Sequence, residues 1–197
     1  MAGTIGTWTI LDAAHAALRT VAVGLTAEDL EQPTPCEQWN VAQVLQHAAG
    51  DQLAYVAAIT GEDGPTENPF APSGTLDRSP VELVDAAVSA SAAAFATVAR
   101  DAETVPSPLP QGALAPWLVA GYCALDAAVH AWDVAMATGR PSPLTPELAK
   151  ELMAAATELT EPLRGWGAYA AVVPGETGDD EVAALVRYLG RRPDWSA

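Results

Sequence analysis

Five stretches of this chain carry alanine, valine and leucine at the three- and four-residue spacing of amphipathic helices, which constrains the fold more than any other feature. They are residues 8–25, 40–61, 79–100, 116–138 and 145–163. The third has a clear start signal, because Ser79 is followed by Pro80 and then by Glu82 as in a capping box. Hydrophobic residues make up 50% of the chain but aromatic residues only 6%. This composition favours closely packed helices over a β-sandwich, so the sequence predicts an all-α fold.

The segment after residue 163 is irregular until a last predicted helix at residues 178–190. Proline-rich loops lie between the earlier helices, but no repeat and no linker long enough to split the chain is evident. We therefore predict a single domain over residues 1–197. It would be a four-helix bundle over about residues 5–163 with a short C-terminal extension and helix at about 164–197.

The charge of the chain excludes some classes of partner. With 9 basic and 25 acidic residues the net charge is −16, so nucleic acid and anionic membranes would be repelled. The uncharged stretch at residues 104–125 is interrupted by four prolines and is not expected to cross a membrane. No signal peptide is evident at the N-terminus, and the two cysteines, Cys36 and Cys123, form no disulfide framework. We expect a cytoplasmic protein that acts on a small molecule.

Two polar side chains in the apolar helix at residues 116–138 suggest a metal site. Asp126 and His130 are four residues apart and therefore share one helical face. His47, on the second helix, could complete a set of three ligands, and three protein ligands leave positions open for a reactant. The spacing alone is equally compatible with histidines that are satisfied within the core.

Other residues are weaker candidates. Asp133, three residues after His130, could orient an imidazole, although a solvent-facing aspartate is the simpler interpretation. His15 could face the bundle interior as a substrate-site residue or a fourth metal ligand. Cys36 and Cys123 are expected to be small buried residues, because few basic residues lie near them in sequence to stabilise a thiolate.

Three segments together resemble a bacterial family of DinB-like metal-binding proteins. They are TPCEQWNVAQVLQHAAG at 34–50, LDAAVHAWDVAMATGRP at 125–141 and LVRYLGRRPDW at 185–195. This family is similar to the N-terminal metal domain of mycothiol-dependent maleylpyruvate isomerase, within the DinB/YfiT-like superfamily.

The resemblance implies a four-helix bundle with a divalent metal, zinc or alternatively nickel, held by His47, Asp126 and His130. The isomerase has glutamate where Asp126 stands, and its C-terminal domain has no counterpart that we can identify here. Characterised members of the superfamily include transferases and isomerases that use bacillithiol, mycothiol or glutathione. Bundles of this superfamily often pair, so a homodimer is a further expectation.

Three functions are compatible with these residues. In the first, the protein is an S-transferase or isomerase in which the metal activates a low-molecular-weight thiol, with mycothiol as the cosubstrate. In the second, no thiol is used, and water activated by the metal serves a hydrolase, lyase or cyclase that acts on a small apolar substrate. In the third, the metal only stabilises a ligand-binding bundle without catalysis.

Overall fold

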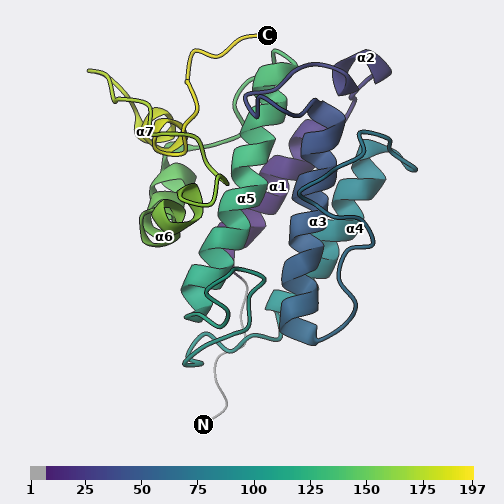
Figure 1. Cartoon of the computed structure of the whole chain (residues 1–197), viewed down its shortest axis with the longest axis vertical. Coiled ribbons are helices and arrows are strands. Elements are labelled where there is room, and N and C mark those ends of the chain that lie inside the picture. Colours follow the sequence, from purple (N-terminus) through teal and green to yellow (C-terminus); the bar gives the residue numbers. More distant parts are fainter. Residues whose placement is uncertain (1–7) are drawn as a thin grey trace.

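The computed structural model describes residues 8–197, and this part of the chain is all-helical, as predicted (Figure 1). The predicted start of the bundle near residue 5 lies outside the described residues. The helices are α1 (Thr9–Ala22), α2 (Ala27–Leu30), α3 (Val41–Thr60), α4 (Pro80–Phe95), α5 (Pro116–Ala137), α6 (Pro146–Arg164) and α7 (Glu181–Tyr188). Within residues 8–197 no helix has both the length and the apolar character needed to cross a membrane.

Local signals in the sequence explain where the long helices begin. The Asn40 side chain accepts a hydrogen bond from the backbone of Gln43, whose own side chain bonds back to Asn40, so α3 begins with a capping box. Ser79 and Glu82 form the same arrangement at the start of α4, as the sequence predicted. Each cap satisfies backbone groups that would otherwise lack partners at the helix end.

A short helix, α2, lies between α1 and α3 and overlaps the start of the proline-containing loop predicted for residues 29–38. The Thr26 side chain accepts a hydrogen bond from the backbone of Asp29, and the carboxylate of Asp29 bonds back to Thr26. This capping box stabilises one helical turn, which is too short to show a hydrophobic period. The loop predicted for residues 29–38 was therefore wrong at Asp29 and Leu30, the last two residues of α2.

The main helices pack in a ring around an alanine- and leucine-rich core. Helix α1 contacts α4 and α5, and α3 also contacts both α4 and α5. Helix α6 packs on a further face of α5 and carries α7 beside it, to one side of the ring (Figure 1). Almost every residue of α5 is therefore buried, including His130 and Asp133. Polar side chains on this helix must find partners inside the protein.

The close approach of α5 and α6 depends on a glycine. A Cβ atom added to Gly121 would lie only 2.8 Å from the Cβ of Ala155. Real Cβ atoms do not approach so closely, so a larger residue at either position would separate the two helices. Small residues at this contact bring the C-terminal part of the chain against the central helix.

Helix α7 ends in a turn that directs the following residue into the protein. The backbone N–H of Gly190 donates to the carbonyl of Arg187, and the N–H of Arg191 donates to the carbonyl of Val186 at 2.8 Å. Together they form a Schellman motif, in which Gly190 has a φ of +85°. A Cβ at Gly190 would lie 2.8 Å from the backbone oxygen of Ala170, so only glycine fits here.

Candidate metal centre

The three residues expected to bind metal come together between α3 and α5. His47 lies on α3, and Asp126 and His130 lie one turn apart on α5. The Nε2 atoms of both histidines are 3.3 Å from the same carboxylate oxygen, Oδ1 of Asp126. The side chains of all three are about nine-tenths buried. The structure thus brings together two nitrogen atoms and one oxygen atom that could hold a cation.

The second nitrogen of each imidazole already has a partner. Nδ1 of His47 lies 2.9 Å from the carbonyl oxygen of Pro69, and Nδ1 of His130 lies 2.9 Å from Oδ2 of Asp133. A carbonyl and a carboxylate can only accept hydrogen bonds, so both Nδ1 atoms must carry a proton. In the neutral imidazoles the lone pairs are then on Nε2, the atoms that converge on Asp126.

One buried atom at this site has no partner. Oδ2 of Asp126 makes no hydrogen bond, although it is inaccessible to solvent. A buried, unpaired carboxylate oxygen costs free energy unless a cation or a donor neutralises it. The residues therefore fit a divalent ion, and a set of two imidazoles and one carboxylate suits zinc or nickel better than magnesium or calcium.

The charged groups of this cluster stabilise one another in the absence of a cation. Burial alone would raise the pKa of Asp126, but the two neighbouring histidines outweigh it and hold that pKa well below its usual range. Burial would likewise lower the pKa of His130, yet Asp126 and Asp133 hold it well above 6.5. These contacts favour the protonated form of His130 in the metal-free protein, and a metal ion at Nε2 would compete with that proton.

Asp51, one turn after His47 on α3, extends the cluster. Burial raises the pKa of this carboxyl to about 7, and the negative charge of Asp126 adds to the shift. Asp51 was not among the candidate residues predicted from the sequence. The available signal was its spacing of four residues from His47, which places both side chains on one face of α3.

Tyrosines lie in the same region beyond Asp51. The hydroxyl of Tyr122, one turn before Asp126, donates to the hydroxyl of Tyr169 at 3.0 Å. The hydroxyl of Tyr55, one turn after Asp51, is buried and has no hydrogen-bond partner. The charges of Asp51 and Asp126 both help to raise the pKa of Tyr55, an effect second to that of burial. A row of polar groups therefore continues from the three candidate ligands along the contact between α3 and α5.

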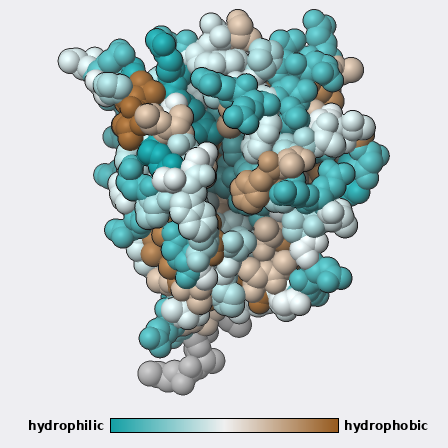
Figure 2. Space-filling view, viewed as in Figure 1, coloured by the Kyte–Doolittle hydropathy of each residue, from teal (hydrophilic) through white to brown (hydrophobic). Residues whose placement is uncertain are grey.

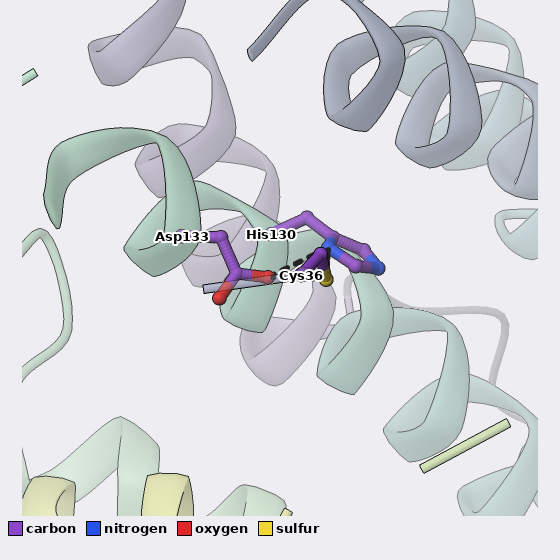
Figure 3. Close-up of side chains that lie close together, drawn as sticks. All are labelled: Cys36, His130 and Asp133. Atoms are coloured by element: carbon purple, nitrogen blue, oxygen red, sulfur yellow. Dashed lines mark hydrogen bonds and ion pairs between the residues drawn. The ribbon is translucent and has the colours of Figure 1, made fainter. Parts of the chain in front are cut away.

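A second group of candidate ligands lies on the other side of His130. Cys36, His130 and Asp133 offer atoms within 4.8 Å of one another (Figure 3). In Figure 3 one ring nitrogen of His130 faces Asp133 and Cys36, whereas the other points away from them. Sγ of Cys36 is 3.3 Å from Oδ2 of Asp133 and 4.0 Å from Nδ1 of His130.

The guanidinium group of Arg191 already neutralises this second group. Its Nε and Nη2 atoms donate to the two oxygens of Asp133, each at 2.7 Å, and Nη2 also lies 3.2 Å from Sγ of Cys36. The side chain of Asp133 is fully buried, and Arg191 holds its pKa well below the usual range against the opposing effect of burial. A metal ion here would meet a fixed positive charge, so the group on the His47 side of His130 is the better candidate for holding a cation.

The outcome for Cys36 differs from the expectation of a simple apolar residue. It is only half-buried and contacts Arg191 and Asp133, which lie 155 and 97 residues away in sequence. Cys123 is fully buried among Gln52 and Ser91, and both thiols are free. The prediction for Cys36 was wrong because it considered only residues near in sequence, whereas the basic neighbour, Arg191, comes from the far end of the chain.

His15 lies away from both groups. Its Nε2 is 2.9 Å from the side-chain oxygen of Gln52, whose amide nitrogen donates to the backbone of Cys123. The ring is 1% exposed and belongs to neither ligand group among the described residues. His15 therefore has the environment of a core histidine, and it supplies no fourth ligand in this arrangement.

Aromatic side chains flank the candidate metal site. The ring of His47 packs between Trp39, with centroids 4.7 Å apart, and Phe70, at 5.6 Å. Phe70 is 68% exposed. Hydrophobic residues form a small patch on the surface in front of α3, among residues of mixed hydropathy (Figure 2). The candidate metal site is therefore bordered by apolar side chains next to His47.

Two surface cavities lie elsewhere. One, of about 230 Å³, lies between α3, α4 and the loop at residues 65–78, and the other, of about 410 Å³, lies between α5, α6 and α7. None of His47, Asp126 and His130 lines either of them. They are therefore separate from the candidate metal centre.

Comparisons with known proteins identify the family of the chain. The family model of the mycothiol maleylpyruvate isomerase N-terminal domain matches residues 11–135. Two relatives from Mycobacterium tuberculosis are Uncharacterized protein MT0763 of strain CDC 1551 / Oshkosh and Uncharacterized protein Rv0738 of strain ATCC 25618 / H37Rv. Each is 32% identical over 182 residues, covering 90% of this chain and 93% of the relative. No solved structure matches the chain significantly.

Proposed function

The chain belongs to the family of the mycothiol maleylpyruvate isomerase N-terminal domain, and on that premise we propose that it is a divalent-metal-dependent enzyme that uses a low-molecular-weight thiol. Mycothiol is the proposed cosubstrate, and S-transfer or isomerisation is the proposed reaction class. The observation that supports metal dependence most directly is the convergence of two imidazole Nε2 atoms on Asp126, whose other oxygen is buried without a partner.

The residues of the chain have separate roles in this proposal. His47, Asp126 and His130 would hold the ion, which is zinc or alternatively nickel. When bound, such an ion lowers the pKa of a coordinated thiol, so that the thiol is deprotonated at neutral pH. The carbonyl of Pro69 and the carboxylate of Asp133 fix the two imidazoles with Nε2 toward the ion.

The polar row beyond the metal ligands is the proposed position of the second reactant. Asp51 lies there with a pKa of about 7 in the metal-free protein and can hold or release a proton. The hydroxyl groups of Tyr55, Tyr122 and Tyr169 offer hydrogen bonds to a polar substrate.

Calorimetry with mycothiol tests the proposal. Metal-loaded protein should bind the thiol and release a proton, because a free thiol has a pKa of about 8.5 and is deprotonated on coordination. Titrations in two buffers of different ionisation enthalpy would measure that proton. Metal-free protein should not bind the thiol. A metal-loaded protein that ignores mycothiol, bacillithiol and glutathione would contradict thiol dependence but leave the metal site standing.

A second candidate function uses water in place of the thiol. Phe70 and Trp39 give one side of the site an apolar surface, which favours a small hydrophobic substrate. The reaction would then be a hydrolysis, elimination or cyclisation. Metal-dependent turnover of apolar esters or amides without any thiol would support this alternative. A role without catalysis has less support, because His15 does not close the site with a fourth ligand.

The remaining features of the proposal concern its setting. We propose a single domain that acts in the cytoplasm on a small molecule, with a homodimer as its assembly. The net charge of −16 supports the further proposal that nucleic acid is not a partner. Sedimentation at several protein concentrations would test the assembly.

A further inference from the structure

We infer that Arg191 is a positioning residue of the metal centre: through Asp133, it fixes the imidazole of His130 in the orientation that a metal ligand needs. This inference builds on the proposed metal site, and the experiments below separate its failure from the failure of that site. It assigns a role to the C-terminal extension, which lies beyond the residues matched by the family model.

The contacts form a continuous chain from the extension to the metal ligand. Both oxygens of Asp133 accept hydrogen bonds at 2.7 Å from the Nε and Nη2 atoms of Arg191. This two-point contact fixes the plane of the carboxylate, which a single hydrogen bond would not do. Oδ2 of Asp133 also accepts the hydrogen bond from Nδ1 of His130 at 2.9 Å, so the fixed carboxylate determines the direction of the ring.

Burial strengthens this arrangement. The side chain of Asp133 is fully buried, and that of Arg191 is 8% exposed. Water therefore cannot replace either partner without opening the protein. Cys36 closes the remaining side, because its Sγ lies 3.2 Å from Nη2 of Arg191 and 3.3 Å from Oδ2 of Asp133. A carboxylate confined in this way has one orientation, and so has the imidazole that it holds.

The backbone before Arg191 is itself fixed. The Schellman turn at the end of α7 requires a left-handed residue, and Gly190 occupies that position against the backbone of Ala170. Nη1 of Arg191 also donates to the carbonyl of Leu189 at 3.3 Å. The guanidinium is thus held from its own end of the chain and can orient Asp133.

Metal affinity provides the first test. Zinc dissociation constants should be measured by competition with a chromogenic chelator for the wild type, Arg191→Gln, Arg191→Lys and Asp133→Asn. We expect Arg191→Gln to weaken binding by about 10–100-fold, the effect usual for groups that orient metal-ligating histidines. Arg191→Lys keeps the charge but not the two-point contact, so it should restore only part of the affinity. It also serves as the test variant if Arg191→Gln does not fold.

Arg192 provides a matched control. It is the adjacent residue of the same type, but its side chain is 71% exposed and pairs only with Asp194 on the surface. Arg192→Gln should leave zinc affinity unchanged. Equal losses for Arg191→Gln and Arg192→Gln would overturn the inference, because they would indicate a general effect of charge.

A double-mutant cycle separates positioning from independent stabilisation. If Arg191 acts through Asp133, the variant Arg191→Gln/Asp133→Asn should lose no more affinity than the worse single variant. The absorption spectrum of bound Co²⁺ should change in Arg191→Gln and stay unchanged in Arg192→Gln. Additive losses of affinity, or an unaltered cobalt spectrum in Arg191→Gln, would overturn the inference.

A measurement on the metal-free protein keeps the two proposals distinguishable. In the wild type, the Nδ1 proton of His130 should give a slowly exchanging imidazole signal in NMR spectra, because it is buried and bound to Asp133. Arg191→Gln should abolish that signal, and Arg192→Gln should retain it. Retention in Arg191→Gln would contradict positioning. Failure of the wild type to bind metal would instead contradict the proposed function alone.

Discussion

The two sides of His130 differ in how their charges are satisfied. On the Nε2 side, Asp126 faces two imidazoles and keeps one buried oxygen without a partner. On the Nδ1 side, Asp133 has both oxygens bonded to the guanidinium of Arg191. Both carboxylates are on α5 and both are largely buried, so burial does not account for the difference.

Two carboxylates on one helix can therefore have different roles: Asp126 is a candidate metal ligand, whereas Asp133 orients the imidazole of His130. Arg191 is a permanent cation that cannot leave Asp133, whereas the cation beside Asp126 must come from solution. A buried carboxylate with a complete set of partners has nothing to gain from a metal ion. A buried carboxylate that lacks a partner is stabilised most by a metal ion. This contrast favours the Nε2 side of His130 as the position of the proposed metal.

The largest expected effect comes from removing candidate ligands on the Nε2 side of His130, where one oxygen of Asp126 has no partner. The double variant His47→Ala/His130→Ala should retain no divalent metal after purification, because only Asp126 would remain of the three ligands. Elemental analysis of protein purified without added metal would measure this. His15→Asn is the matched control, since it alters a buried histidine outside both groups and should keep the metal. Full occupancy in the double variant would place the ligands elsewhere.

Breaking the ion pair between Asp133 and Arg191, on the Nδ1 side of His130, should lower the free energy of unfolding. Asp133→Asn leaves the guanidinium of Arg191 buried without its counter-charge, and such a loss costs about 3–5 kcal/mol in the free energy of unfolding. Urea denaturation of the metal-free protein would measure it. Asp85→Asn removes the exposed pair with Arg19 and should cost no more than about 1 kcal/mol.

The cost of Asp133→Asn should also depend on pH. Because the pKa of Asp133 is lowered in the folded protein, its stabilising effect is fully present above the unfolded pKa of about 3.9. It is lost as the pH falls through the lower, folded pKa. The stabilities of the wild type and the variant should therefore converge in strong acid. A constant difference at all pH values would contradict the charge-based explanation.

Metal affinity should rise with pH. Asp126 and Asp133 raise the pKa of His130 in the metal-free protein against the opposing effect of burial, so the protonated imidazole competes with the metal for Nε2. Below that raised pKa, affinity should increase about tenfold for each pH unit, as for release of one proton. Chelator competition between pH 6 and about pH 8 would measure the slope. A flat profile would show that His130 is already neutral.

The smallest expected effect concerns Cys36. Its thiol contacts Arg191 and Asp133, but the guanidinium and the carboxylate bond directly to each other. Cys36→Ala should therefore lower stability by only about 1 kcal/mol, as for loss of one neutral hydrogen bond. Thermal unfolding of Cys36→Ala and Asp133→Asn, measured under the same conditions, would compare their losses of stability. A loss as large as that of Asp133→Asn would contradict this, because it would mean that the thiol stabilises the protein as much as the ion pair does.

The sequence predicted more of the fold than of the site. Capping residues such as Asn40 and Ser79 act over three residues, so the long helices could be located from local patterns. The pairing of Asp126 with His130 was also local, since both lie on one helical face. Arg191 is 58 residues from Asp133 and 155 from Cys36, and no helical period connects such distant positions. The packing of α6 on α5, with α7 beside α6, brings them together.

The contact between Cys36 and Arg191 has a consequence for how the molecule assembles. It joins positions separated by 155 residues, so it can form only after the intervening helices have closed most of the loop between them. Until then, Asp133 would lack the guanidinium that bonds to both of its oxygens. The buried ion pair thus makes the docking of the C-terminal extension and the order of the proposed metal centre depend on each other. A partly assembled chain should then bind metal more weakly than the folded protein, if the proposed site is correct.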